Sequence, residues 1–262
     1  MIAFVKHNYE MQALLILPSS KSDKFAEHTN MISMKALIIA FVLSVTASTL
    51  LSAQTYTVKR IKQGNINFSN NNNSAWNKAN ALSDFSYPWE NGIAPATSFK
   101  ALWNGQWLYC RYEVKDDSIL VLVKKNDKLE TGASDRVEIF FNINDSMRPY
   151  YCLEMDANGR VLDYSASYYR KMNYNWQWPK DQLKVKALRT STGYIVEAAI
   201  SIQSLKDLGL LQNNRLHAGL FRAECKGFIN NRADLRWISW IKPSSQQPDF
   251  HIPSAFGTLI LQ

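Results

Sequence analysis

A succession of short strand-like segments, with almost no helical pattern between them, most limits how this chain can fold. Residues 97–103 and 106–114 alternate apolar and polar side chains on either side of Asn104-Gly105. Asn-Gly between two such runs is the strongest short-range signal of a β-hairpin, because both residues tolerate the positive φ that a tight turn needs. This region is therefore predicted to be a pair of antiparallel strands.

Similar segments recur along the rest of the chain. Only residues 201–211 show helical spacing, with Ile202, Leu205 and Leu208 on one face and Gly209 after them. Because strands without intervening helices cannot build a parallel α/β sheet, we predict an all-β protein: an antiparallel two-sheet β-sandwich, jelly-roll-like, with one short helix. The further predicted strands are 135–144, 150–156, 160–167, 183–189, 194–200, 217–225, 235–241 and 255–261.

Residues 31–53 have the three-part pattern of a secretory signal peptide. Lys35 is followed by an apolar run from Ala36 to Val45 and by Leu51-Ser52-Ala53. A membrane-spanning helix needs roughly 20 apolar residues, and this run is shorter. We therefore expect cleavage after Ala53, no membrane span afterwards, and an exported protein that is periplasmic, secreted or on the cell surface.

The position of this signal divides the chain into three parts. Residues 1–30 precede the signal and show no periodicity, so they are predicted to be a misassigned extension, with the true start at Met31 or Met34. Residues 54–262 have the length of a single all-β domain.

The net charge of +8 comes from 30 basic and 22 acidic residues. The basic residues are scattered among carboxylates, and the one short cluster, Lys124, Lys125 and Lys128, is followed by Glu130. Nucleic acid is therefore not an expected partner, since its recognition needs a concentrated basic surface.

The three cysteines lie inside strand-like segments, at Cys110, Cys152 and Cys225. Their spacing matches no zinc site. An oxidising compartment would allow one disulfide, but buried free thiols are the favoured interpretation.

Charged and amide side chains recur two residues apart on several predicted strands. Such spacing indicates either a solvated outer sheet face or a polar surface that holds a hydroxyl-rich ligand. The pairs are Arg111 and Glu113, Glu138 and Asn142, Glu154 and Asp156, and Arg222 and Glu224.

An ordered set of motifs resembles carbohydrate-binding module family 9 and the related sugar-binding sandwiches of the DOMON-like group. No single motif is specific, but their order is, and the match runs from Trp76 to Gln262. The motifs are Trp76-Asn77-Lys78-Ala79, Leu102-Trp103-Asn104-Gly105, Val114-Lys115-Asp116-Asp117, Ser134-Asp135-Arg136-Val137-Glu138-Ile139-Phe140, Gly193-Tyr194-Ile195-Val196-Glu197-Ala198, Trp240, Pro248-Asp249-Phe250-His251 and Phe256-Gly257-Thr258-Leu259.

This resemblance implies a sandwich that holds a terminal sugar between two tryptophan rings while polar groups bind its hydroxyls. It assigns Glu138 as the leading hydroxyl-binding carboxylate, with Arg136 as a weaker companion. It assigns Trp240 as one stacking ring, with Trp237 as the alternative register. Glu154 and Arg111 complete the polar candidates.

The chain departs from the family pattern where the first stacking tryptophan is expected, because residues 129–133 contain no aromatic residue. Either Trp176 or Trp178, expected to be an exposed pair, supplies that ring, or the two-ring clamp is absent. The resemblance also implies structural calcium at Asp116 and Asp117, which otherwise serve as turn formers. No organic cofactor is expected.

The sequence therefore predicts an exported module that binds oligosaccharides or polysaccharide ends and supports polysaccharide breakdown beside glycoside hydrolases, without catalysis of its own. One alternative is an O-glycosyl hydrolase accessory that uses Glu138 with Glu154 or Asp156. The others are a haem-binding sandwich that uses His217 or His251, and a periplasmic interaction module.

Overall fold

The computed structural model describes residues 54–62, 66, 74–230 and 232–262, so the predicted extension and signal peptide lie outside the described residues. Within this part the all-β prediction is confirmed, since strands dominate and the one α-helix is short. None of its helices is long and apolar enough to cross a membrane.

All ten predicted strands are present, and the structure adds two that the sequence pattern missed, β1 and β7. The strands are β1 (Thr55–Arg60), β2 (Thr97–Trp103), β3 (Trp107–Lys115), β4 (Arg136–Asn142), β5 (Tyr150–Asp156), β6 (Val161–Ser167), β7 (Lys171–Asn173), β8 (Leu183–Thr190), β9 (Gly193–Ser201), β10 (Arg215–Ile229), β11 (Arg232–Ser239) and β12 (Gly257–Leu261).

The predicted helix is confirmed but short. It is α2 (Ile202–Asp207), and the Ser201 side chain caps it by accepting a hydrogen bond from the Gln203 backbone N–H. Gly209 follows with a φ of +71°, a conformation that glycine adopts without steric cost. The described residues also contain three 3₁₀ turns: η1 (Ser74–Lys78), η2 (Lys128–Ala133) and η3 (Pro253–Ala255).

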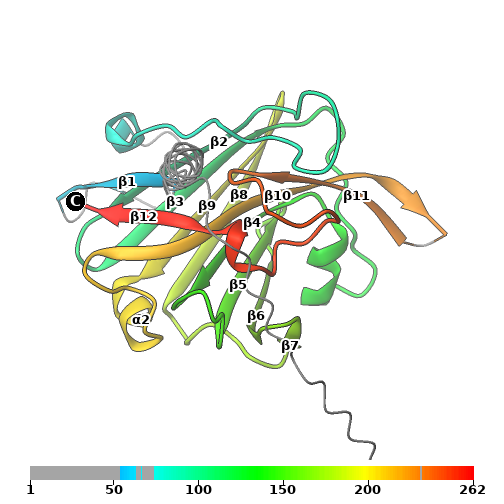
Figure 1. The fold of residues 1–262 in the computed structure, drawn as a ribbon. Coiled ribbons are helices and arrows are strands. Elements are labelled where there is room, and N and C mark those ends of the chain that lie inside the picture. Colours follow the sequence, from blue (N-terminus) through cyan, green and yellow to red (C-terminus); the bar gives the residue numbers. More distant parts are fainter. Residues whose placement is uncertain (1–53, 63–65, 67–73, 231) are drawn as a thin grey trace, which may run out of the picture. The chain divides into compact units, whose positions relative to one another are not determined.

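The division into two separate sheets is not what the structure shows. The strands form one hydrogen-bonded sheet in the order β7-β6-β5-β4-β10-β12-β1-β2-β3-β9-β8, with β11 paired to β10. Strand β1 connects the two halves of this sheet, because it pairs in parallel with β12 on one side and with β2 on the other. Figure 1 shows the resulting curled sheet. The predicted division is incomplete because β1, near the start of the described residues, is hydrogen-bonded to both halves.

The main core lies inside the curl, where the two halves of the sheet meet. Phe99 and Tyr112 from β2 and β3 belong to the same buried cluster as Ile139 and Leu153 from β4 and β5. Burying one face of each half in this way is the main source of stability for such a sheet.

A second, smaller core covers part of the outer face of β4, β5 and β10. Phe140, Tyr150 and Phe221 pack there against Phe250 from the segment that precedes β12. The Phe221 and Phe250 rings stack at 3.9 Å. The polar site described next lies beside this second core.

The three cysteines are buried free thiols, as the sequence favoured.

Candidate functional site

A polar pocket of about 60 Å³ lies on the outer face of β4 and β5, next to the second core. It gathers four of the eight predicted ligand residues: Arg136, Glu138, Glu154 and Trp237. The full lining is Trp89, Arg136, Glu138, Glu154, Arg170, Trp237, Pro248, Asp249, Phe250 and His251.

Strand register places these predicted residues together. Glu138 on β4 lies directly opposite Glu154 on β5. Arg136 is two residues before Glu138 and therefore points to the same face. Ala223 on β10 pairs with Arg136 on one side and with Trp237 of β11 on the other. Three neighbouring strands and β11 thus build one continuous surface.

Arg136 is the centre of the charge arrangement. Its Nη2 lies 2.8 Å from Glu138 Oε1, and its Nε lies 2.7 Å from Glu154 Oε2. Nη1 donates a hydrogen bond to the Gly132 carbonyl, and the Tyr164 hydroxyl donates to Glu154 Oε1. Burial raises the pKa of the Glu138 carboxyl, and the neighbouring guanidinium counteracts part of that rise. Arg136 thus holds the two buried carboxyl groups, which are the acceptors at the base of the pocket, in fixed positions.

Two tryptophans supply the aromatic walls. Trp237 is half-buried, with the Arg136 guanidinium carbon 5.5 Å from its ring centroid and the Phe250 ring packed edge-on at 5.7 Å. Trp89 packs on Phe250 at 5.2 Å and donates its Nε1 hydrogen bond to the Ser245 carbonyl. Sequence reasoning missed Trp89, although Pro88 beside it in a polar stretch marked a loop aromatic of the kind that favours binding.

The segment 248–251 closes the third side. The Asp249 carboxylate accepts hydrogen bonds from the Tyr169 hydroxyl and the His251 backbone N–H. The Arg170 Nη1 lies 3.5 Å from the same carboxylate. Burial, together with the charge of Arg170, lowers the pKa of His251 to about 4, so its ring is neutral near pH 7. Sequence reasoning quoted this segment as a motif but gave it no role in sugar binding; His251 was considered only for the haem-binding alternative.

Three predicted aromatic ligands lie elsewhere. Trp240 belongs to the main core and is 5% exposed. The expectation of an exposed Trp176 and Trp178 pair is wrong for Trp178, which is 6% exposed and donates its Nε1 hydrogen bond to Ser204 Oγ. Trp176 is partly buried against Tyr151, with ring centroids 5.0 Å apart. The loop folds onto the core because its two indoles cover apolar surface there.

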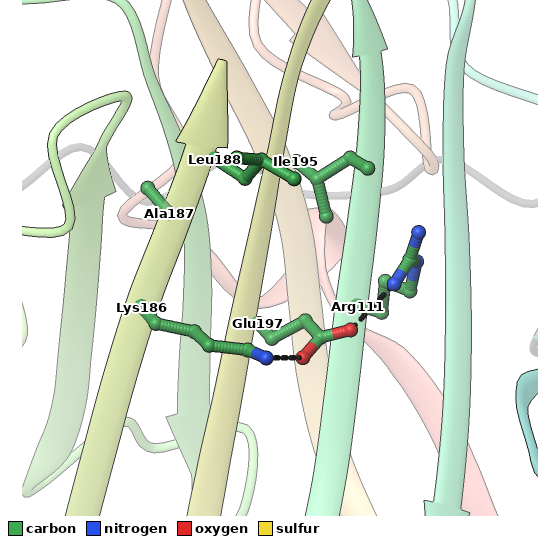
Figure 2. Close-up of a pocket in the computed structure, with 6 residues that line it drawn as sticks. All are labelled: Arg111, Lys186, Ala187, Leu188, Ile195 and Glu197. Carbon is green, nitrogen blue, oxygen red and sulfur yellow. Dashed lines mark hydrogen bonds and ion pairs between the residues drawn. The ribbon is translucent and has the colours of Figure 1, made fainter. Parts of the chain in front are cut away.

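Arg111 lies on a different surface, the outer face of β3 (Figure 2). Its Nη1 is 2.6 Å from Glu197 Oε1, and Lys186 Nζ is 3.0 Å from Glu197 Oε2. The adjoining cavity measures about 10 Å³, which is no more than one water molecule occupies. This group is a structural ion-pair cluster, separate from the polar pocket.

The two predicted calcium ligands, Asp116 and Asp117, do not form a metal site with other carboxylates. Asp116 Oδ2 lies 2.8 Å from Nη2 of Arg222, a side chain with no exposed surface, and Asp117 is exposed. Among the described residues, no group of three His, Cys, Asp or Glu side chains is placed to hold a metal ion. A carboxylate that already neutralises a buried guanidinium fits a calcium site poorly, so calcium stays a prediction of the sequence resemblance.

A second concavity, of about 580 Å³, lies at the ends of β3 and β9. Phe85, Ile93, Val114 and Tyr194 line it together with hydroxyl side chains. It contains none of the predicted ligand residues, so the smaller polar pocket is the candidate site.

No curated protein matches the chain. Among solved structures, a Bacteroides uniformis ATCC 8492 protein described as carbohydrate-binding is similar, with a TM-score of 0.62 and 17% identity over 80% of this chain and 100% of that chain. Two structures of a carbohydrate-binding module family 9 from Caldicellulosiruptor kristjanssonii also match over 80% of this chain. The complex with cellotriose has a TM-score of 0.49 and 16% identity, and the match covers 94% of its chain. The complex with glucose has a TM-score of 0.46 and 18% identity, and the match covers 96% of its chain.

At 17% identity, the Bacteroides uniformis structure shows a similar fold and no more. The family comparison carries further, because it extends over residues 69–262 and so over most of the chain. On that match, the chain belongs to the family described as carbohydrate family 9 binding domain-like.

Proposed function

We propose that the polar pocket binds the end of an uncharged glycan, and that the protein works as a binding module without catalysis of its own. The observation that carries this proposal is the buried Arg136, Glu138 and Glu154 cluster beside Trp237. Carboxylates are strong acceptors for sugar hydroxyls, and an indole surface suits the apolar C–H face of a sugar ring. Membership of the family supports the same ligand class.

The charges of the pocket favour an uncharged sugar. Arg136 is occupied by two carboxylates, and Arg170 is paired with Asp249. Both guanidinium groups of the lining therefore already have carboxylate partners, and an acidic sugar would bring its own carboxylate close to Glu154 and Asp249. The volume of about 60 Å³ is far below the several hundred cubic ångströms of a pocket for a larger ligand. A pocket of this size suits a chain end.

The biological setting belongs to the same proposal. The signal-like segment 31–53 supports export to the periplasm, the medium or the cell surface. An exported sugar-binding module assists polysaccharide breakdown by keeping separate glycoside hydrolases near their substrate. Secretion followed by N-terminal sequencing would test the cleavage site after Ala53.

The first experiment is a glycan-array screen of the purified protein, followed by calorimetry of the hits with wild type and Trp237→Ala. Saturable binding that the substitution weakens would support the proposal. Silence across the array from folded protein would overturn it. Shortened products after incubation with the hits, absent for Glu138→Gln, would instead support the O-glycosyl hydrolase alternative.

A further inference from the structure

The second concavity, of about 580 Å³, lies across the ends of three strands and shares no lining residue with the polar pocket. Strand register places Ser98 of β2, Glu113 of β3 and Ile195 of β9 side by side along it. Residues of the segment 83–96 line it as well. Its volume lies within the range of about 300 to 1,000 Å³ that is typical of sites for small organic ligands. The concavity is therefore large enough for a ligand of its own.

Apolar side chains make up much of its lining, among them Phe85, Val114 and Ile195. Ile93 also lines the concavity and is 97% exposed. Removing such an apolar surface from water is favourable, and a ligand with an apolar body would do so here. The lining therefore favours a ligand that is largely apolar.

The charges of the lining favour a negative group on that ligand. Glu113 is the one carboxylate of the lining, and it already has two basic partners, Arg111 Nε at 2.8 Å and Lys100 Nζ at 3.7 Å. Lys115 is exposed in the same lining, and the part of the chain that the structure describes gives its ammonium group no carboxylate partner. An anionic group on the ligand would complement this ammonium group.

Hydroxyl groups lie at the same end of the concavity as Lys115. In the β3–β9 pair Lys115 is opposite Gly193, and Thr192, the residue before Gly193, lines the concavity. A threonine hydroxyl can donate a hydrogen bond to a carboxylate. The Lys115 backbone N–H donates a 2.9 Å hydrogen bond to the Ala96 carbonyl, which holds the segment that carries Ile93 at the end of β3. The cationic and the apolar part of the lining are thus parts of one site.

We propose that the second concavity binds a small organic acid, a molecule with one carboxylate and an apolar body. The carboxylate pairs with Lys115, and the apolar body covers Ile93 and Phe85. This inference goes beyond the proposed function and does not depend on it, because the two sites share no lining residue.

The test is calorimetry of the folded protein with octanoate and with 1-octanol, which has the same apolar chain and no charge. Wild type is expected to bind octanoate about two- to fivefold more tightly than 1-octanol, the gain of one exposed ion pair. Lys115→Gln should remove this preference and leave the affinity for 1-octanol within about twofold. Ile93→Ser should weaken the binding of both ligands by about three- to tenfold, because both lose an apolar contact.

The matched controls are Ile229→Ser and Lys171→Gln, which change an exposed isoleucine and an exposed lysine outside the lining. Both controls should bind octanoate and 1-octanol as wild type does. Equal affinities of wild type for the two ligands, or no saturable binding of octanoate, would overturn the proposal. A loss in Ile229→Ser as large as that in Ile93→Ser would also overturn it, since binding would then be unspecific.

Discussion

Trp237 and Trp240 are three residues apart and lie on opposite sides of the sheet. Trp237 lines the polar pocket next to Arg136, whereas Trp240 is 5% exposed in the main core. Side chains an odd number of positions apart in a strand point to opposite faces, so only one of the two can reach a ligand in the pocket. Trp237, the alternative that the resemblance ranked second, is the one of the two that lines the pocket.

The two tryptophans should therefore respond differently to replacement by alanine. Trp237→Ala is expected to weaken sugar binding by about 1 to 3 kcal/mol, because it removes an aromatic wall of the pocket. Trp240→Ala is expected to lower the free energy of unfolding by about 3 to 5 kcal/mol, because it leaves a cavity in the core. Calorimetry and urea unfolding measure the two effects. Weaker binding by a folded Trp240→Ala protein, with Trp237→Ala unaffected, would contradict this assignment.

Arg136→Met should lower the free energy of unfolding by about 3 to 5 kcal/mol, because it leaves two buried carboxylates without their partner. Arg136 and Glu138 are 4% and 1% exposed. The matched control is Arg236→Met, which breaks an exposed ion pair with Glu90 and should cost about 0 to 1 kcal/mol. Urea unfolding at pH 7 compares the two variants. An equal loss in the free energy of unfolding would show that the buried ion pairs of Arg136 stabilise the fold no more than an exposed pair does.

His251 should make the protein less stable in mild acid. Its folded-state pKa of about 4 lies below the value of about 6.5 for an exposed histidine, so the unfolded chain binds the proton more readily. The free energy of unfolding is therefore expected to fall as the pH drops from 6.5 through 4, by on the order of 2 kcal/mol from this group. Arg170, Asp249 and Arg136 are the charged groups that act on it, and the Tyr150 hydroxyl lies 3.0 Å from its Nδ1.

The measurement is urea unfolding between pH 4 and pH 7 for wild type and His251→Gln. The variant should show a flatter dependence over this range, because glutamine takes up no proton. Parallel curves for the two proteins would assign the acid sensitivity to other groups.

The sequence resemblance and the geometry at Asp116 predict different effects of calcium on stability. The resemblance implies that calcium stabilises the fold, whereas the ion pair with Arg222 predicts that adding calcium or a chelator leaves the melting temperature unchanged. Asp116→Ala should cost about 3 kcal/mol in either condition, because it leaves a buried guanidinium unpaired. A rise in melting temperature with calcium that Asp116→Ala abolishes would restore the metal site.

Much of the fold follows from local patterns in the sequence. Alternating side chains and the turn at Asn104-Gly105 gave strand positions that the structure confirms. The placement of Arg136 and Glu138 on one face also follows, because residues two apart in a strand share a face. Capping by Ser201 at its start and Gly209 after its end explain why helix α2 is short.

Only tertiary structure decides which face of each strand meets the core. Side chains alternate between the two faces of a strand, and this alternation is the same whichever face is buried. Glu138 faces the pocket, whereas Arg222 shares the face of Val137 in the main core. The sequence also could not bring Trp89, Arg170 and Asp249 to one pocket, since long-range packing between distant segments does so. Local chemistry thus determined the strands and the kinds of ligand residue. The curl of the sheet, closed by β1, determined which of those residues meet.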